Sequence, residues 1–562
     1  MNVVIVGGVA AGMSAAARLR RLDERARIVV LERDRYVSYA NCGLPYHIAG
    51  DIAEREKLLV ATPEHLRATL DLDVRTQHEV LSVDRGAHTV EVLNRATGER
   101  YVELYDKLVL AQGAEPIRPP APGNDHPRVL TLRSIPDMDR VLAAVDGGAR
   151  QAVVIGGSYI GLEVAEALRR RGLAVDLVEL QEQILPLFDR EMTGALGEHL
   201  AGHGVTLHLG TAAQSFADEA GRVRVELRDG TQLTADLVLL AVGVRPASGM
   251  ARAAGLALGP RGGIAVDRHM RTSDPDIYAA GDMVEVVDTV TGEPALIALA
   301  GPANRQGRIV ADHIAGRGAA YTTTQGTAVV KVFEMTAAAT GASEKTLKRL
   351  GTPYHKVYLH PSGHAGYYPG TAQMHLKLLF APSDGRVLGA QVVGFDGVDK
   401  RVDVLATAIR AGLTVFDLEG LELAYAPPYG SAKDPVNMAG FVAANLLRGD
   451  VSFWYAEDYP AKAHGATIVD VRSPQEYADW HIPGALNIPL PELRQRLFEL
   501  RESAAGGPVL LYCMVGIRSY LAYRVLRQHG IEAVTLAGGA KTFLGFHPAH
   551  PTAVADEMLT PA

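Results

Sequence analysis

The two cysteines of this 562-residue sequence are its strongest candidates for redox chemistry, and they lie far apart. The first, Cys42, stands in the stretch Ser-Tyr-Ala-Asn-Cys-Gly-Leu-Pro-Tyr, which runs from Ser38 to Tyr46. Asn41 and Gly43 favour a turn, and a helix is expected just after the sulfur, so that N–H groups at a helix start would stabilise a thiolate. A lone thiol is more often a small buried apolar group, but these neighbours favour a redox nucleophile.

The second cysteine follows an apolar strand and opens a short loop before a helix. Val509–Tyr512 is the strand, and the loop Cys-Met-Val-Gly-Ile-Arg runs from Cys513 to Arg518. Successive backbone N–H groups in such a loop form a nest that stabilises a thiolate and then the terminal sulfur of a persulfide. We therefore expect Cys513 to carry sulfur and Arg518 to close the ring of donors around it.

The elements that would position Cys42 begin with a dinucleotide-binding pattern. Val3–Val6 predicts a buried strand, a glycine-rich turn follows at residues 7–12, a helix continues to Leu22, and Glu32 ends the next strand. Glycines let the backbone approach a pyrophosphate at a helix start, and the acid accepts hydrogen bonds from ribose hydroxyls. Val9 departs from the pattern, because it occupies the place of the middle glycine.

The same pattern returns about 150 residues later. Ala152–Ile155 predicts a strand, a turn from Gly156 to Gly161 leads into a helix, and the following strand ends at Glu179, with Ser158 in place of the middle glycine. Two dinucleotide sites in one chain indicate electron transfer between them. The Glu179 carboxylate would accept a hydrogen bond from a ribose 2′-hydroxyl and would repel a 2′-phosphate, which favours NADH over NADPH.

Composition excludes several other classes of protein. The net charge is −8 and no long Lys/Arg run occurs, which argues against a nucleic-acid partner. Two distant cysteines cannot form a disulfide framework, so a cytoplasmic location is expected. The apolar start, Val3–Leu19, is interrupted by glycines and lacks a charged leader, and no apolar run is long enough to span a membrane. No metal site is expected.

Three further turns at strand ends complete a family resemblance. Leu108–Ala114 and Leu239–Pro246 are strands that end in small-residue turns, and a strand near Ile277 ends in Gly281-Asp282. Together with the two glycine patterns, these residues resemble the two-dinucleotide flavoprotein disulfide reductases. The resemblance implies FAD in the first unit and NADH in the second, and it places Asp282 at the ribityl chain of the flavin. The implied FAD residues are Gly7, Gly8, Ala11, Gly12, Glu32, Arg33, Val80, Ala111, Gly113, Gly281 and Asp282, and the implied NADH residues are Gly156, Gly157, Tyr159, Ile160, Gly161, Glu163, Glu179 and Gly243.

From about residue 321 the pattern changes to strands and turns. Strands are predicted over 325–333, 354–359, 373–380 and 387–393, and a helix over 402–411. In the family this region is a dimerisation domain. By the resemblance Tyr367 and Tyr425 would reach into the partner's site, where a phenol steadies a leaving thiolate or donates a proton. Tyrosines beside Gly and Pro are also commonly packed loop residues, and this alternative stays open.

The C-terminal part resembles rhodanese, a sulfurtransferase. The strand that begins at Thr467, the run His-Ile-Pro-Gly-Ala from His481 and the Cys513 loop carry the likeness. Related phosphatases have five residues between the cysteine and the arginine, whereas four stand here, which favours sulfane sulfur over phosphate as cargo.

The predicted fold class is therefore α/β: two Rossmann-like dinucleotide-binding domains, an α+β dimerisation domain and a C-terminal α/β rhodanese domain. The expected boundaries are 1–148 with 269–320 for the FAD domain, 149–268 for the NADH domain, 321–447 for the dimerisation domain, 448–462 for a linker and 463–555 for the rhodanese domain.

A single cysteine in the reductase part narrows the chemistry. Glutathione-type reductases carry a second nearby cysteine, but His47 stands in that place here, so Cys42 must cycle through a mixed disulfide, a persulfide or a sulfenic acid. The text around Cys42 resembles the single-cysteine coenzyme A disulfide reductases and the NADH-dependent CoA-persulfide or polysulfide reductases. That likeness implies a CoA channel, although the arginines could equally form a solvated helix face. The implied channel residues are Ser14, Arg18, Arg21, Ser38, Asn41 and Asn304.

The expected function is a homodimeric, NADH-dependent flavoprotein that reduces CoA persulfide, polysulfide or CoA disulfide. Cys42 would attack the CoA-bound sulfur to form a mixed disulfide, which the reduced flavin would resolve, and Cys513 would supply sulfane sulfur. Two alternatives stay open: an NADH oxidase or peroxidase that cycles a Cys42 sulfenate, and a non-enzymatic redox sensor or sulfur carrier.

Overall fold

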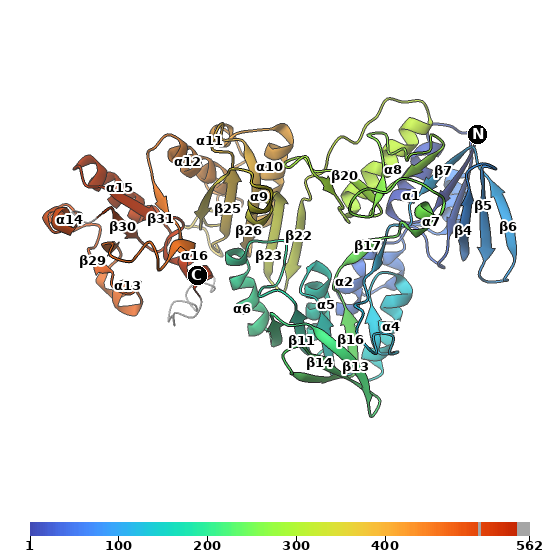
Figure 1. Ribbon diagram of the computed structural model, residues 1–562, viewed down its shortest axis with the longest axis horizontal. Helices are drawn as coiled ribbons and strands as arrows, with labels where there is room; N and C mark the ends of the chain where they lie inside the picture. The colour runs from blue at the N-terminus through green and yellow to red at the C-terminus, as the bar shows by residue number, and fades with distance from the viewer. Residues whose placement is uncertain (504–506, 548–562) are drawn as a thin grey trace. The chain divides into compact units, whose positions relative to one another are not determined.

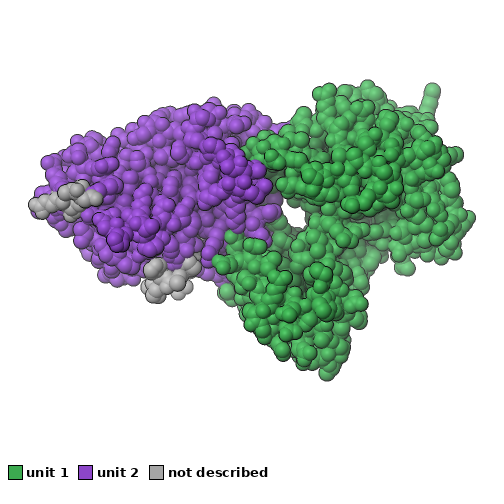
Figure 2. Space-filling model, viewed as in Figure 1, with its two compact units in different colours: residues 1–184, 201–326 green, residues 185–200, 327–562 purple. Residues whose placement is uncertain are grey.

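The computed structural model describes residues 1–503 and 507–547, so the part of the predicted rhodanese domain after residue 547 lies outside the described residues. The chain divides into two compact units, residues 1–184 with 201–326 and residues 185–200 with 327–562 (Figure 2). Each unit is described by itself.

The first unit contains two parallel five-stranded sheets (Figure 1). The first sheet has the order β19-β7-β1-β2-β3, and the second has the order β12-β11-β10-β16-β9. The strands of the first are β1 (Asn2–Val6), β2 (Arg27–Glu32), β3 (Asp73–Thr76), β7 (Lys107–Leu110) and β19 (Ile277–Ala279). The strands of the second are β9 (Val129–Thr131), β10 (Gln151–Ile155), β11 (Ala174–Glu179), β12 (Val205–Leu209) and β16 (Leu237–Leu240). Their central residues are almost fully buried, as expected for parallel strands covered on both faces.

Helices and smaller sheets complete this unit. α1 (Ala10–Arg20) follows β1 and packs against α8 (Ala300–Ile314), and α5 (Tyr159–Arg170) follows β10. A short helix, α2 (Leu44–Ala49), packs against both α5 and α4 (Ile135–Asp146). β4 (His78–Asp84), β5 (Thr89–Asn94) and β6 (Arg100–Leu104) form an antiparallel sheet, and β13 (Ala213–Glu219), β14 (Arg222–Leu227) and β15 (Gln232–Ala235) form another.

The second unit begins with an antiparallel sheet in the order β22-β23-β26-β25-β24. Its strands are β22 (Ala328–Val332), β23 (Met335–Gly341), β24 (His355–Leu359), β25 (His375–Phe380) and β26 (Val387–Gly394). The helices of this part are α9 (Glu344–Leu350), α10 (Val398–Ala411), α11 (Val415–Glu419) and α12 (Pro435–Leu447). The four predicted strands are found with slightly shorter or longer bounds, and β23 is an additional strand.

A second sheet in this unit is parallel and has the order β27-β31-β30-β28-β29. Its strands are β27 (Phe453–Trp454), β28 (Ile468–Asp470), β29 (Leu486–Asn487), β30 (Val509–Tyr512) and β31 (Ala533–Leu536). Its helices are α13 (Pro474–Asp479), α14 (Leu497–Ser503), α15 (Ile517–Gln528) and α16 (Gly539–Phe546). β27 lies within the predicted linker: it pairs with β31, and the Trp454 side chain is fully buried. That part of residues 448–462 therefore belongs to the sheet.

A buried group of charges lies on the antiparallel sheet of the second unit. The Lys377 side chain is 0% exposed, and its ammonium is paired with the carboxylates of Asp189, Glu191 and Glu344. Lys356 bridges Glu344 to Glu457, which stands just after β27. We call these six residues the lysine cluster. It ties the segment 185–200 and the start of the C-terminal sheet to one face of β24 and β25.

Within the described residues, no helix combines the length and the apolar character needed to cross a membrane.

Candidate functional site

The first glycine turn leaves no room for a side chain at Gly7 or Gly12. Gly7 has a φ of +104°, and a Cβ there would stand 2.4 Å from the Ala111 carbonyl oxygen. A Cβ on Gly12 would stand 1.9 Å from the Gly7 oxygen, so the start of α1 lies directly on the turn. The Gly8 N–H donates to the Glu32 carboxylate over 2.8 Å, which fixes the acid beside the turn.

The second turn repeats this construction. Gly156 has a φ of +109°, and a Cβ there would stand 2.4 Å from the Ala241 carbonyl oxygen. A Cβ on Gly161 would stand 1.8 Å from the Gly156 oxygen. The Gly157 N–H donates to Glu179 over 2.7 Å. Val9 and Ser158 both have negative φ, so neither needs to be glycine. This explains the departure from the pattern at both places.

The donor sets of both turns fit a dinucleotide. Besides its bond to the glycine turn, the Glu32 carboxylate accepts the Asp34 N–H, and Glu179 accepts the Gln181 N–H, each over 2.9 Å. Both acids are buried, and burial raises the pKa of Glu32 despite these N–H donors. A glycine turn at a helix start offers N–H groups to phosphate, and a fixed carboxylate offers acceptors to ribose.

Cys42 lies in a single 3₁₀ turn, Asn41–Gly43, immediately before α2. The residue is exposed, and its sulfur lies 3.8 Å from the Asn41 side-chain oxygen. Partial burial by surrounding atoms and the carboxylates of Glu163 and Asp282 raise the pKa of the thiol, while Arg133 and the local backbone lower it. The backbone thus favours the thiolate as expected, but burial and the two carboxylates outweigh it, so that the net effect of the protein is to raise the pKa of Cys42.

Two polar pairs account for the charges around Cys42. The Tyr46 hydroxyl donates to Glu163 over 3.2 Å, and Arg133 pairs with Asp282 over 3.2 Å. Burial raises the pKa of Glu163 from 4.5 to about 7, with Glu166 adding to the rise and the Tyr46 hydrogen bond opposing it. Burial also raises the pKa of Asp282, against the effect of Arg133.

The tyrosines predicted for the partner's site come together in the second unit. The Tyr367 and Tyr425 hydroxyls are hydrogen-bonded over 2.7 Å, from loops that lie far apart in the sequence. Tyr367 is 75% exposed and Tyr425 is 47% exposed. Such exposure contradicts the alternative in which these rings are packed loop residues, and the mutual hydrogen bond raises the pKa of Tyr367.

The Cys513 loop forms the expected nest only in part. Cys513 is buried, and its sulfur accepts the Gly516 N–H over 3.2 Å. Arg518 does not close the ring on the sulfur, because its two amino groups bind the Glu476 carboxylate at 2.7 and 2.6 Å. This bidentate pair is the main reason that the pKa of Glu476 falls to about 2.

The start of α16 holds the backbone of the same loop. The N–H groups of Ala540 and Lys541 donate to the carbonyls of Cys513 and Met514 over 2.8 and 3.0 Å. On its other side α16 meets the antiparallel sheet, where Thr542 is hydrogen-bonded to His360 over 2.9 Å and Lys541 binds Gln373. The cysteine loop and the loop between β24 and β25, which carries Tyr367, are thus both held by this helix.

Comparisons with known proteins agree with this architecture. The sequence model of the pyridine nucleotide-disulphide oxidoreductases matches residues 1–307, and their dimerisation domain matches residues 327–434. The chain belongs to the pyridine nucleotide-disulphide oxidoreductase family. A rhodanese-like domain matches residues 456–545, so the predicted fold class is confirmed.

The relatives share these domains to different extents. Coenzyme A disulfide reductase of Staphylococcus haemolyticus is 36% identical over 79% of this chain and 100% of its own. The solved reduced CoADR-RHD of Bacillus anthracis is 45% identical, with a TM-score of 0.95, and covers 98% of this chain and 99% of its own. A NAD-dependent persulfide reductase from A. fulgidus is 37% identical, with a TM-score of 0.91 over 97% of this chain and 100% of its own. The resemblance read from the sequence is confirmed.

Most residues expected to bind the cofactors of this oxidoreductase gather at the carboxyl ends of parallel strands, where α/β sheets bind ligands. The FAD set follows β1, β2, β7 and β19, and the NADH set follows β10, β11 and β16. Val80 is the exception, since it lies in β4 with its side chain in the core.

Four of the six residues expected to bind CoA, Ser14, Arg18, Arg21 and Asn304, lie on or directly beside α1 and α8. The Ser14 hydroxyl donates to Asn304, and Arg18 pairs with Asp312 over 2.7 Å with 16% of its side chain exposed. Arg18 is therefore not a freely solvated residue, whereas Arg21 is exposed. Elsewhere in the unit, the Ser38 N–H donates to the Gly8 carbonyl over 2.7 Å, with a φ of +46° at Ser38.

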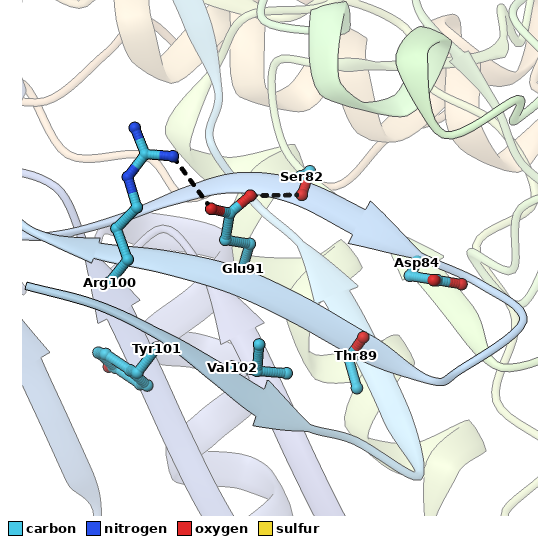
Figure 3. Close-up of a pocket in the computed structure, with 7 residues that line it drawn as sticks. All are labelled: Ser82, Asp84, Thr89, Glu91, Arg100, Tyr101 and Val102. Carbon is cyan, nitrogen blue, oxygen red and sulfur yellow. Dashed lines mark hydrogen bonds and ion pairs between the residues drawn. The ribbon is translucent and has the colours of Figure 1, made fainter.

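A shallow pocket lies elsewhere in this oxidoreductase, on the sheet of β4, β5 and β6. Figure 3 shows Arg100 and Ser82 directed toward Glu91, which binds both through its carboxylate. None of the predicted site residues lines this pocket. It therefore has no part in the candidate site.

Sequence reasoning missed four residues of the candidate sites. Tyr46 was within the stretch around Cys42, one helical turn beyond the sulfur, and this spacing could have indicated it. Glu476 lies in α13, and nothing in the sequence indicates that it binds Arg518. Arg133 and Lys541 have no local signal, because only the folded chain brings them to the two cysteine segments.

Proposed function

We propose that this protein is an NADH-dependent flavoprotein reductase of CoA-linked persulfide or disulfide, with sulfane sulfur delivered by Cys513. The observation that carries the proposal is the surroundings of Cys42: an exposed thiol at a helix start, with two carboxylates and Arg133 beside it, and no second cysteine in residues 1–447. The relatives named for CoA disulfide and persulfide reduction support it.

The chemistry of this site follows from a single thiol. Cys42 thiolate attacks the CoA-bound sulfur of CoA persulfide, so that a Cys42–CoA disulfide forms and hydrosulfide leaves with the electron pair of the broken bond. With CoA disulfide the same attack releases CoA thiolate. When bound, FAD supplies the electron pair that reduces the mixed disulfide, and the pyridine nucleotide replenishes it.

The residues proposed to hold the cofactors are those of the two turns. Gly7, Gly8, Gly12 and Glu32 would hold FAD together with Asp282, which Arg133 keeps in place. The corresponding turn of β10 and α5, with Glu179, would hold the nicotinamide nucleotide. The family implies FAD and NAD(P)H, and the preference for NADH is part of the proposal.

The C-terminal domain is proposed to act as a docked sulfur donor. Cys513 would take up sulfane sulfur in a nest to which Gly516 contributes an N–H. Because α16 joins the loop to the antiparallel sheet, the donor is held in the second unit by more than its linker. Delivery to CoA-bound acceptors then takes place at a high effective concentration.

A homodimer is proposed from the dimerisation domain. The hydrogen-bonded tyrosine hydroxyls would serve the partner's Cys42 site, with one phenol positioned by the other. Ser14, Arg18, Arg21 and Asn304 would line the CoA channel, and the arginines would meet its phosphates. A cytoplasmic location is proposed from the two free cysteines.

The test is anaerobic NADH oxidation by the purified protein with CoA persulfide, CoA disulfide, polysulfide or peroxide as the acceptor. We expect rapid multiple turnover with the CoA-linked sulfur acceptors and release of hydrosulfide only from those with sulfane sulfur. Cys513→Ser should leave turnover of preformed CoA persulfide within about twofold of wild type, since the proposed role of that residue is delivery. Turnover with peroxide alone would contradict the proposal.

An oxidase is the second candidate, because a water-forming NADH oxidase of Lactobacillus brevis is 29% identical with a TM-score of 0.77 over 80% of this chain. Under air, this function predicts NADH oxidation without any sulfur acceptor and a sulfenate on Cys42. Trapping with dimedone under turnover distinguishes the two candidates, since a mixed disulfide does not react with it.

Coenzyme preference gives a separate prediction. Glu179 is buried and already holds two N–H groups, so a 2′-phosphate would meet a fixed negative charge. We expect kcat/KM to favour NADH over NADPH by roughly ten- to hundredfold, from like-charge repulsion in a partly buried site. Glu179→Gln should reduce this ratio. Asp176→Asn should not, although Asp176 lies on the same strand as Glu179, because the carboxylate that it removes is bound to His208. An unchanged ratio in Glu179→Gln would show that another group reads the ribose.

A further inference from the structure

Helices α2 and α5 pack against each other (Figure 1). They bring together a phenol and a carboxylate, and the phenol lies in the helix that follows Cys42. Tyr46 lies one turn beyond Cys42, and its hydroxyl donates to the Glu163 carboxylate over 3.2 Å. All three residues belong to the first unit, so their arrangement does not depend on the second. The Glu163 carboxylate raises the pKa of the Cys42 thiol electrostatically. The Tyr46 hydroxyl, through its hydrogen bond, lowers the pKa of Glu163.

The two carboxylates near Cys42 differ in how they are compensated. Asp282 is paired with Arg133, so this pair is close to neutral. Among the described residues, no Lys or Arg forms an ion pair with Glu163, whose polar partner is the neutral phenol. A charge on Glu163 therefore acts on Cys42 without a cation to cancel it.

Most other charged groups around these helices form ion pairs, and Arg169 of α5 donates to backbone carbonyls. Glu166 lies on the same face of α5, nearly one turn after Glu163, and opposes ionisation of Glu163. Glu166 itself has Arg170 within 3.6 Å. Further ion pairs on or beside α2, α4 and α5 are Arg55–Asp139, Arg140–Asp137, Arg170–Asp51 and Arg171–Asp146. Of the two carboxylates that act on the thiol, Glu163 is the one without a paired cation, so its protonation changes the field at Cys42 most directly.

We propose that Cys42 and Glu163 share one negative charge, so that the thiolate forms with Glu163 protonated, and that Glu163 releases its proton through Tyr46 when the sulfur becomes neutral. This inference rests on the proposed function for its substrate. Because the Glu163 carboxylate acts electrostatically on the Cys42 thiol, the state in which both groups are charged is disfavoured. The neutral Cys42–CoA disulfide removes that penalty, and Glu163 can then ionise.

The resulting step balances. Cys42 thiolate, the Glu163 carboxylic acid and CoA persulfide give the Cys42–CoA disulfide, the Glu163 carboxylate and hydrogen sulfide. The bond from the Cys42 sulfur to the CoA sulfur forms, and the bond to the outer sulfur breaks. The Cys42 sulfur is oxidised, and the outer sulfur is reduced and leaves with the electron pair. The Tyr46 hydroxyl gives its proton to this sulfur and takes up the proton of Glu163. The same proton would protonate CoA thiolate when CoA disulfide is the substrate.

The test measures the Cys42 thiol directly and needs no sulfur substrate. In the Cys513→Ser background Cys42 is the only cysteine, so iodoacetamide alkylation of the FAD-loaded protein, followed by mass spectrometry, reports that thiol alone. In Glu163→Gln the midpoint of the pH–rate profile is expected to fall by about one pH unit, with alkylation near pH 7.5 about tenfold faster. The matched control, Asp51→Asn, removes a carboxylate paired with Arg170 and should leave the profile unchanged.

Tyr46→Phe is the milder variant. In the wild type the hydrogen bond from the Tyr46 hydroxyl lowers the pKa of Glu163. Loss of this hydrogen bond leaves Glu163 more protonated near neutral pH, so alkylation should be faster there, but by less than in Glu163→Gln. In the double variant the Tyr46 change should add nothing, because the phenol acts through Glu163. A profile in Glu163→Gln that superimposes on wild type, in protein that retains FAD absorbance, overturns the inference. Because no CoA compound is used, that result is independent of whether the proposed reductase activity is found.

Discussion

Cys42→Ser is expected to abolish NADH-driven reduction of CoA persulfide and CoA disulfide, with a loss on the order of 10³-fold or more in kcat. The reason is that the reductase part has no second cysteine to take over the attack on sulfur. A serine hydroxyl stays protonated at neutral pH, and it cannot form the disulfide that the reaction requires. Anaerobic NADH oxidation, followed at 340 nm with each acceptor, measures the loss.

The matched control for this prediction is Cys513→Ser, which removes the other thiol of the chain. It should keep reduction of preformed CoA persulfide and lose transfer of sulfane sulfur from a donor. Both variants should still reduce an artificial electron-accepting dye with NADH, because the dye takes electrons from the flavin without a thiol. This activity would show that the nucleotide sites are intact. Full turnover in Cys42→Ser with any sulfur acceptor would remove Cys42 from the mechanism.

Lys377→Met is expected to destabilise the second unit by about 3–5 kcal/mol, because it leaves the three carboxylates of the lysine cluster buried without their central cation. The melting temperature followed by circular dichroism should fall by on the order of 10 °C. Lys348→Met is the matched control: it removes a cation 2.8 Å from Glu344, but one whose side chain is 61% exposed. Its effect should stay below about 1 kcal/mol.

Acidity should act on the same cluster. Burial alone would raise the pKa of Glu344, but Lys377 and Lys356 outweigh burial and hold that pKa well below 4.5. The stability that Glu344 contributes is therefore complete above about pH 4.5 and is lost as the pH falls toward its pKa in the folded protein. In Lys377→Met this acid-side dependence should move toward neutral pH. Equal melting temperatures for the two lysine variants would mean that the cluster is not the source of the stability.

The parts of the fold with strong periodic patterns could be predicted from the sequence. The strands around the two glycine turns, β1, β2 and β10, are largely apolar and either precede a glycine or end in an acid, so their type and ends follow from burial and turn chemistry. β23 was not predicted, because its sequence, Met-Thr-Ala-Ala-Ala-Thr-Gly, is rich in alanine, whose intrinsic preference is helical. Pairing with β22 and β26 overrides that preference.

The candidate site was predictable wherever it consists of one continuous segment. The glycine turns, Cys42 and the Cys513 loop are local features, and the pattern places them correctly. The electrostatic partners are not local: Glu163 of α5 reaches Tyr46 of α2, and Glu476 of α13 reaches Arg518 of α15. The resemblance named Glu163 as a nucleotide residue, but no pattern indicates the Tyr46 contact, which depends on how α2 packs against α5.

The double attachment of α16 matters for anyone who wishes to transplant the sulfurtransferase. If that module were separated before residue 448, Thr542 and Lys541 would become exposed to solvent. The reductase left behind would expose the buried His360 and more of the half-buried His375, and burial lowers the pKa of both imidazoles here. A chimaera that grafts only the C-terminal sheet would therefore lose the surface against which its cysteine loop is braced. The relatives that end where the reductase ends must finish this face of their sheet in some other way.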